Sequence, residues 1–379
     1  MADNVFDQMK KAGSEKIIAD FVVKQKQDYA FKRNYAETRA WYFYNHPEIA
    51  GKAYVAVGGL DSITLYLFLR SIGIDVPAVS VSSLENKSIQ RVHRALGVKT
   101  LKPAKKDDGT HWTKREVIKE FGFPILSKEI AGKIALLQNP TPDNATVRHA
   151  IITGETGEYG GWQTNSRMKM SDVWLKKFGG ADPEGAEKGY QAAPFKVSDK
   201  CCYYLKEKPC NDYAKETDSF PYMGLMASEG GRRQKALMLH GCNYISPATK
   251  RSCPFAIFYR DDLLRLAKEM DQWYHEHLDL FPGEALDTIV PAIYGQIKTG
   301  ADGKLYTTGA QRTGCDICGF GIHMEKRPNR FDALREENEK AWRFWMYNVG
   351  FGAVLSYIGV GWERRMERSE QISMFEECV

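Results

Sequence analysis

Apolar residues alternate between strand-like and helix-like spacing in the region from residue 53 to residue 101. The predicted elements, in order, are strand 53–57, helix 63–72, strand 76–81, helix 87–96 and strand 98–101. The first of these helices is apolar on nearly all sides, which is typical of a buried helix. A β-α-β-α-β order predicts an α/β fold with a doubly wound parallel sheet.

Helical spacing also extends on both sides of this region. The further predicted helices are 15–29, 35–44, 110–121, 128–138, 261–277 and 329–347. The glycine-rich segment 151–161 predicts a loop, and segment 179–194, rich in Gly, Ala and Glu, predicts an irregular excursion. Segment 223–227 predicts a later strand.

Composition narrows the class of protein. The chain has 379 residues, and at about 100–200 residues per domain this indicates two domains, or one α/β domain with a large appendage. Hydrophobic residues make up 43% of the chain, enough for a sizeable core, and the net charge is +5. So mild a charge suits anionic ligands but is weak evidence for nucleic-acid binding.

We expect neither a targeting segment nor a membrane segment in this sequence. Residues 1–26 are polar and mixed in charge, unlike a signal peptide, and no apolar run reaches the ~20 residues of a membrane span. We therefore expect a cytoplasmic protein with no membrane partner. In that compartment the eight cysteines should be mostly reduced, so clustered cysteines indicate metal binding or catalysis.

The segment Gly58-Gly59-Leu60-Asp61-Ser62 joins the first predicted strand to the first predicted helix. Glycines allow a tight turn in which backbone N–H groups converge on an anion, and the following helix adds its positive N-terminal end. Ser62 can donate a hydroxyl, and Asp61 can cap the helix or help to hold a metal in catalysis. The segment predicts a phosphate-binding loop; the alternative is a plain turn with Asp61 as helix cap.

Two cysteine pairs lie far apart in the chain. Cys201 and Cys202 are adjacent, and Cys315 and Cys318 form a CxxC. Four thiolates suffice for a [4Fe–4S] cluster or, as the alternative, tetrahedral zinc. Adjacent ligands are sterically demanding, so three cysteines with one open iron remain an alternative, as does Cys242 in place of one of the adjacent pair.

The loop and several later segments resemble a known superfamily. Strand–Gly-Gly-x-Asp-Ser–helix is similar to the PP-loop of the adenine nucleotide α-hydrolases, which include ATP pyrophosphatases and sulfonucleotide reductases. From about residue 50 to 362 the chain resembles phosphoadenosine phosphosulfate (PAPS) reductase family proteins of the phage and prophage type. The segments that carry this resemblance are 122–129, 198–202, 224–229, 241–243 and 312–321. One departure is Val57, which stands where the loop usually has a leading serine.

This resemblance implies site residues. The nucleotide phosphates would lie on Val57 to Ser62, and the adenosine near Ser80 and Ser82. Residues that resemble a further nucleotide-holding block in relatives are Glu229, Arg232 and Arg233. As in APS reductases, the two cysteine pairs would hold a [4Fe–4S] cluster. Cys378 resembles the catalytic cysteine of the reductase tail, although the Gly-Ile-His that usually follows it is missing.

The resemblance also implies a domain division. It consists of an N-terminal helical segment over 1–50, a PP-loop nucleotide-binding α/β domain over 51–280, and a C-terminal helical region with the CxxC over 281–379.

Three functions follow as expectations. The first is an oxidoreductase of sulfur metabolism that reduces PAPS or APS to sulfite with a thioredoxin-like reductant. The second is an ATP pyrophosphatase, using Mg²⁺ with ATP, that adenylates a nucleic acid and acts as its sulfurtransferase, in tRNA thiolation or DNA phosphorothioation. The third is a non-enzymatic sensor that binds nucleotide and cluster.

Overall fold

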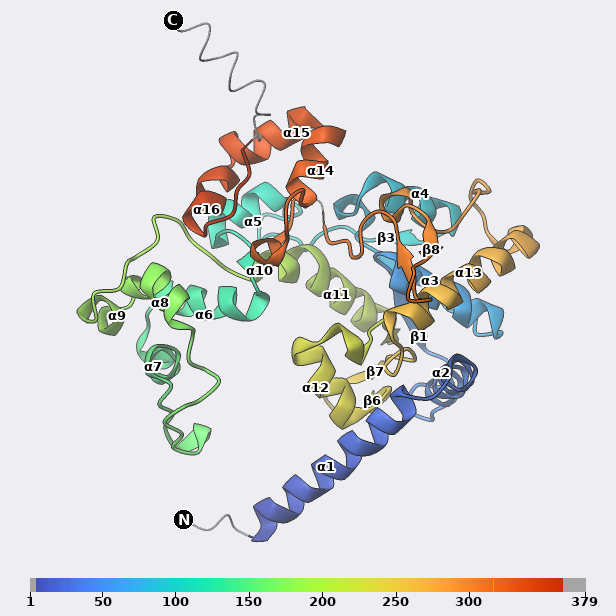
Figure 1. The fold of residues 1–379 in the computed structure, drawn as a ribbon, viewed down its shortest axis with the longest axis horizontal. Coiled ribbons are helices and arrows are strands. Elements are labelled where there is room, and N and C mark those ends of the chain that lie inside the picture. Colours follow the sequence, from blue (N-terminus) through green and yellow to red (C-terminus); the bar gives the residue numbers. More distant parts are fainter. Residues whose placement is uncertain (1–4, 316, 364–379) are drawn as a thin grey trace, which may run out of the picture. The chain divides into compact units, whose positions relative to one another are not determined.

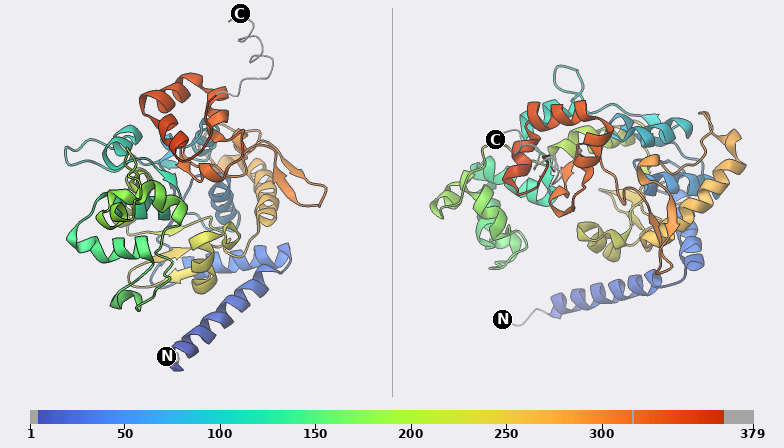
Figure 2. Two further views of the ribbon diagram at one scale, coloured as in Figure 1. Left: turned by 60° about the vertical axis from the view of Figure 1, so that its left-hand side comes forward. Right: turned by 45° about the horizontal axis from the view of Figure 1, so that its top comes forward.

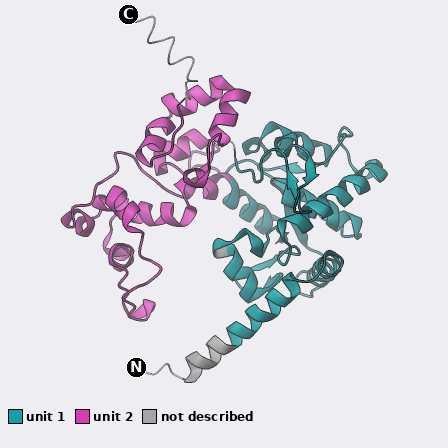
Figure 3. Cartoon of the chain, in the orientation of Figure 1, with its two compact units in different colours: residues 1–104, 206–316 teal, residues 105–205, 317–379 magenta. Residues whose placement is uncertain are grey.

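The computed structural model describes residues 5–315 and 317–363, with the side chains of 5–12 and of Arg232 outside the description. The chain forms two compact units, which Figure 3 shows in different colours. Unit 1 consists of residues 1–104 and 206–316, and unit 2 of residues 105–205 and 317–379. This grouping differs from the three domains expected above, because segment 105–205 leaves the first unit and the chain then returns to it.

A central sheet of six strands organises unit 1 (Figure 1). Its strands, in spatial order, are β3 (Lys99–Thr100), β2 (Ala78–Ser80), β1 (Ala53–Ala56), β5 (Phe220–Tyr222), β7 (Lys250–Ser252) and β6 (Asn243–Ile245). All neighbours are parallel except β6, which is antiparallel to β7. The mixed α/β class with a mostly parallel sheet is thereby confirmed.

Both faces of this sheet carry helices. Ala53 and Val55 of β1 belong to the large core formed with α3 and α13, whereas Tyr54 packs with Val79 and Tyr213 of α11 on the other face. The helices of unit 1 are α1 (Val5–Gln25), α2 (Tyr29–Tyr44), α3 (Leu60–Ser71), α4 (Lys87–Ala95), α11 (Lys208–Glu216), α12 (Gly231–His240) and α13 (Arg260–Glu276). Two-sided burial explains why the central strands β1 and β2 carry few polar residues.

The order of the strands places a switch point inside unit 1. From β1 the chain proceeds to β2 and β3 on one side, whereas β5 lies on the other side of β1. The loops that leave the carboxyl ends of β1 and β5 therefore diverge and leave a crevice between them, which is where open α/β sheets bind ligands. A small hairpin, β8 (Ile297–Thr299) with β9 (Leu305–Thr307), completes the strands described in unit 1.

Unit 2 is mainly helical and has a separate apolar core. Its helices are α5 (Lys114–Phe121), α6 (Lys128–Gln138), α7 (Ala145–Thr153), α8 (Asp172–Phe178), α9 (Pro183–Glu187), α10 (Lys200–Cys202), α14 (Arg330–Glu337), α15 (Glu339–Arg343) and α16 (Phe351–Tyr357). Two short strands, β4 (Ile125–Leu126) and β10 (Gly319–Phe320), pair in parallel. Figure 2 gives two further views of these helices.

Three local predictions were wrong. Segment 223–227 is not a strand, because β5 ends at Tyr222. Gly224 then packs against the backbone of Asp61, so closely that a Cβ added at Gly224 would lie 2.8 Å from the Asp61 carbonyl oxygen. The predicted helix 329–347 is broken at Asn338, whose side chain accepts from the Ala341 N–H and starts a new helix. Residues 151–153 are helical rather than loop, since α7 continues to Thr153.

No helix in the described ranges 5–315 and 317–363 has both the length and the apolar character needed to cross a bilayer.

Candidate nucleotide site

The predicted phosphate loop follows β1 and leads directly into α3. Val57 is buried in the core, with 5% of its surface exposed, so this position packs instead of offering a polar group. Leu60, the first residue of α3, is fully buried and anchors the helix start. Two buried apolar side chains, those of Val57 and Leu60, therefore anchor the loop to the hydrophobic core.

Hydrogen bonds inside the loop fix its shape. The Gly58 N–H donates to Ser62 Oγ at 2.7 Å, and the Ser62 hydroxyl donates to the Gly59 carbonyl at 3.0 Å. The Leu60 N–H donates to the hydroxyl of Tyr294 at 3.0 Å. Two of the N–H groups expected to meet a phosphate are therefore already hydrogen-bonded to hydroxyl oxygens, which a ligand anion would have to replace.

Close packing accounts for Gly59. A Cβ at this position would stand 2.2 Å from the Tyr294 hydroxyl and 2.8 Å from Thr313 Oγ1. Those two hydroxyls are themselves hydrogen-bonded at 2.6 Å. The neighbouring Gly58 is less confined, because its nearest contact would be Glu85 Oε1 at 3.7 Å. The sequence gave no signal for Tyr294, and Thr313 appeared only within segment 312–321, with no indication that it would lie against the loop over 200 positions away.

A cavity of about 420 Å³ opens over this loop in unit 1, within the size range of small-molecule sites. Its lining comes from the loops after β1 and β5, the start of α12 and segment 311–313. The lining residues are Ala56, Gly59, Leu60, Asp61, Ser62, Met223, Gly224, Leu225, Glu229, Arg233, Tyr294, Gln311, Arg312 and Thr313. The crevice expected from the strand order therefore coincides with the predicted loop.

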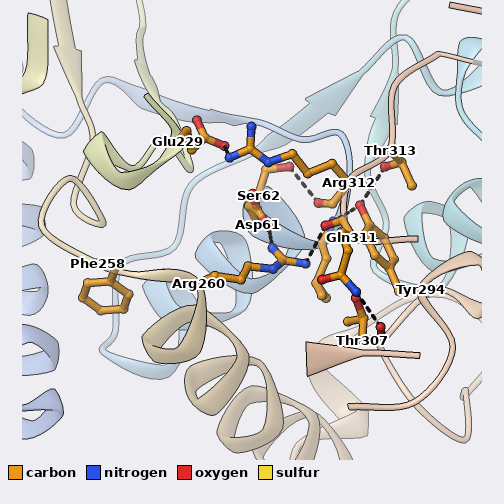
Figure 4. A network of polar contacts seen from close by, with 12 residues as sticks. Asp61, Ser62, Glu229, Phe258, Arg260, Tyr294, Thr307, Gln311, Arg312 and Thr313 are labelled. Atoms are coloured by element: carbon orange, nitrogen blue, oxygen red, sulfur yellow. Dashed lines mark hydrogen bonds and ion pairs between the residues drawn. The ribbon is translucent and has the colours of Figure 1, made fainter. Parts of the chain in front are cut away.

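Charged side chains of both signs meet in this cavity (Figure 4). Arg260 donates to Asp61 Oδ1 at 2.6 Å and to the Gln311 carbonyl at 3.0 Å. Glu229 pairs with Arg233 at 2.8 Å and lies 3.5 Å from Arg312. Two carboxylates and two guanidinium groups thus line the space above the loop, and a third guanidinium group, that of Arg260, pairs with Asp61 without lining it. The sequence gave no reason to select Arg260, which lies almost 200 positions from the loop.

The protonation of Asp61 reflects this setting. Burial raises the pKa of the Asp61 carboxyl, Arg260 opposes that rise, and the charge of Glu229 adds to it. The ion pair with Arg260 is what keeps a carboxylate at this position compatible with burial.

Ser80 and Ser82 are buried, and neither is among the cavity's lining residues in the part of the chain that the structure describes. Ser82 instead touches His93, with 2.9 Å between Oγ and Nδ1, and His93 Nε2 lies 2.8 Å from the Gly58 carbonyl. A carbonyl only accepts, so Nε2 carries the proton and Nδ1 accepts from Ser82. His93 therefore links the second strand to the phosphate loop.

His93 predicts a specific acid sensitivity. Burial lowers the pKa of His93, although the Gly58 carbonyl and Glu85 oppose this and Lys206 adds to it. Between the two pKa values His93 binds a proton in the unfolded chain but not in the folded one. The free energy of unfolding is therefore unaffected by His93 above about pH 6.5 and falls as pH drops below it. We expect His93→Gln to show a smaller fall in melting temperature from pH 7 to pH 5 than wild type.

His149 is the matched control for this prediction. Glu184 raises the pKa of His149, so its contribution has the opposite sign and His149→Gln should steepen the acid loss. Equal pH profiles for His93→Gln and wild type would contradict the proposed state of His93.

The remaining predicted nucleotide residues have differing positions. Glu229 and Arg233 line the cavity. Arg232 lies in α12, but its side chain is outside the description. Val57 and Gly58 support the loop without being among the lining residues described.

The predicted metal ligands belong to both units. Cys315 is in unit 1, and Cys201, Cys202 and Cys318 are in unit 2. Cys201 is buried, while Cys202, Cys315 and Cys318 are partly exposed. Among the described residues, no three His, Cys, Asp or Glu side chains are grouped so as to hold a metal ion. The cluster and its zinc alternative stay predictions.

Cys315 and Cys242 occupy contrasting settings in unit 1. Burial alone would lower the pKa of Lys206, but Cys315 and Glu85 beside it raise that pKa, so the ammonium is retained. Lys206 donates to Glu85 at 2.5 Å, next to Gly58. Cys242 is buried in the core, and that burial raises the pKa of its thiol to about 11. Cys378, the predicted catalytic cysteine, lies outside the described residues.

Comparison of the chain with known proteins found no similar protein. No protein-family model matches the chain, and neither a curated protein nor a solved structure matches it.

Proposed function

We propose that the protein is an enzyme that binds an adenine nucleotide in the cavity above the 58–62 loop and uses it in sulfur chemistry. The observation that carries the binding is the coincidence of the loop, the switch point of the sheet and a cavity lined by arginines. Arginine guanidinium groups suit phosphate because they donate in a fork. The choice of an adenine nucleotide as ligand, and of sulfur chemistry as the reaction, comes from the PP-loop resemblance.

The first candidate reaction is reduction of a sulfonucleotide. A thiolate attacks the sulfur of PAPS or APS, the S–O bond breaks, and the nucleotide leaves with its phosphate oxygen. A second thiol, from a thioredoxin-like donor, then attacks the enzyme-bound thiosulfonate, so sulfite leaves and a disulfide forms. Arg233 and Arg312, which line the loop cavity, would stabilise the leaving phosphate. The predicted nucleophile for this reaction is Cys378.

The second candidate is cleavage of ATP to adenylate an acceptor. Asp61 and Glu229 favour it, because both carboxylates line the loop cavity and oxygen ligands suit the Mg²⁺ that accompanies ATP. Bound Mg²⁺ would neutralise charge on the leaving pyrophosphate, while the loop and arginines hold the phosphates.

An anaerobic nucleotide panel tests the proposal. The full chain is incubated with ATP, APS or PAPS, with and without thioredoxin, and pyrophosphate and sulfite are measured together. Sulfite from PAPS or APS assigns the reductase, and pyrophosphate from ATP assigns the pyrophosphatase. Binding without turnover assigns the sensor, and no binding of any adenine nucleotide overturns the proposal. Cys378→Ser should abolish sulfite release if that thiol is the nucleophile.

The cofactor is tested separately on anaerobically purified protein. We expect iron and acid-labile sulfide, lost together when Cys315 or Cys318 is replaced by serine. One zinc and no iron would contradict the cluster and support tetrahedral zinc.

A further inference from the structure

A second cavity, of about 670 Å³, adjoins the loop cavity within unit 1. Gln311 and Arg312 line both cavities and stand between them, whereas Arg260 lines only the second. Figure 4 shows Arg260 beside Gln311, to whose carbonyl oxygen it donates. The loop cavity is assigned above to an adenine nucleotide, whereas the second cavity has so far no role. Two spaces with a common wall are what a reaction between two substrates requires.

The acidic residues of the second cavity are already neutralised. Asp262 holds the ammonium of Lys32 at 2.7 Å, and both side chains are buried. Asp261 accepts from the Leu305 N–H at 2.7 Å and pairs with Arg265 at 3.0 Å. Neither carboxylate therefore contributes much uncompensated negative charge to the cavity.

The cations of the second cavity are less fully compensated. Lys304 is 75% exposed, with Asp302 at 3.9 Å, and Arg312 is 60% exposed, with Glu229 at 3.5 Å. Arg260 uses both terminal nitrogens, but its buried Nε has no hydrogen-bond partner among the described residues. The balance of charge is positive, so the cavity suits an anion.

Apolar and aromatic groups make up the rest of the lining. Tyr259 is 42% exposed, and the Lys32 ammonium makes a cation–π contact with its ring, 4.5 Å from the centroid. Met226 and Leu305 line the same space. An exposed ring with flanking apolar side chains is the usual platform for a nucleobase, and nearby cations hold its phosphate.

We propose that this second cavity binds a nucleotide unit of the second substrate, with its base against Tyr259 and its phosphate near Lys304 and Arg312. The role as acceptor site rests on the proposed function; the binding itself does not. The nucleotide unit has two sources, a single-stranded polynucleotide or a free nucleotide. Both offer an aromatic base and a phosphate.

Binding experiments on the full chain distinguish these sources. The probes are a ten-nucleotide oligouridylate and free UMP, chosen because they lack the adenine of the first site. Adenine-nucleotide binding is measured on the same samples. Oligouridylate affinity is expected to fall about five- to tenfold in Tyr259→Ala and in Lys304→Glu, with adenine-nucleotide affinity unchanged.

Two neighbouring positions provide matched controls. Tyr306 and Lys298 are exposed on the β8–β9 hairpin that also carries Lys304, and neither is among the described residues that line the second cavity. Tyr306→Ala and Lys298→Glu should leave oligouridylate affinity within twofold of wild type. Since Lys304 is highly exposed, Lys304→Glu should fold even if Tyr259→Ala does not.

The outcomes separate the two proposals. Variant-sensitive binding of oligouridylate assigns a polynucleotide, and equally sensitive binding of UMP alone assigns a free nucleotide. If neither probe binds, or if the cavity variants equal their controls, the second site is refuted even where adenine nucleotides bind. If oligouridylate binds with the expected sensitivity but no adenine nucleotide binds, the proposed function fails and the second site stands.

Discussion

Gly59→Ala is expected to reduce nucleotide turnover by about 100-fold, as a displacement near 1 Å in a catalytic site does. The new Cβ would lie 2.2 Å from the Tyr294 hydroxyl and 2.8 Å from Thr313 Oγ1, so the loop or both partners must move. Overpacking of this kind costs about 1–3 kcal/mol of unfolding free energy. The rate of pyrophosphate or sulfite release measures the turnover, and the denaturation midpoint measures the stability.

Gly58→Ala is the matched control for this substitution. Its Cβ would meet nothing closer than Glu85 Oε1 at 3.7 Å, an ordinary contact, so stability should stay within about 0.5 kcal/mol of wild type. A second control is Gly59→Ala combined with Tyr294→Phe. Removing the hydroxyl leaves the ring carbon at 3.5 Å as the nearest Tyr294 atom, so part of the lost stability should return. Unchanged stability and turnover in Gly59→Ala would contradict this account of the loop.

Arg260→Met is expected to destabilise the protein by roughly 2 kcal/mol at pH 8, and by much less near pH 5. This substitution leaves Asp61 partly buried without its cation; breaking a fully buried pair costs about 3–5 kcal/mol, and partial exposure reduces that cost. The side chains of the pair are 27% and 25% exposed. Chemical denaturation across this pH range measures the effect.

The sign follows from the pKa of Asp61. Burial already raises this pKa above 3.8, and loss of Arg260 raises it further. The folded variant then binds a proton that the unfolded chain releases, so its stability falls as pH rises from about 4 through the folded pKa. The deficit relative to wild type is therefore complete at high pH and shrinks as the carboxyl protonates.

Two further variants check this interpretation. Arg260→Met with Asp61→Asn removes the unpaired charge and should recover most of the loss at pH 8. Arg265→Met removes the ion pair of Arg265 with Asp261 on the same helix, α13. The Arg265 side chain is half-exposed, so this variant should change stability little at any pH. A pH-independent loss in Arg260→Met would refute the role of the Asp61 charge.

The sequence by itself determined the local elements around the loop. Period and composition placed β1, α3, β2, α4 and β3 within a few residues, because the spacing of apolar residues within a segment is a local feature that reflects which of its own faces is buried. Gly58 to Ser62 was found for the same reason, since a turn between strand and helix is a local feature. Segment 329–347 was misread because continued helical spacing hid the capping signal of Asn338.

Only the tertiary structure decided what surrounds the loop. Tyr294, Arg260 and Thr313 reach it from segments about 200 or more positions away. His93 fixes the loop carbonyl through a contact that no spacing encodes. The strand order, with β5 beside β1, places the crevice, and that pairing joins residues 167 positions apart, as in Ala53 with Phe220. Such contacts depend on how the sheet assembles, because non-local pairing is selected by the burial of whole faces and not by the residues of any one segment.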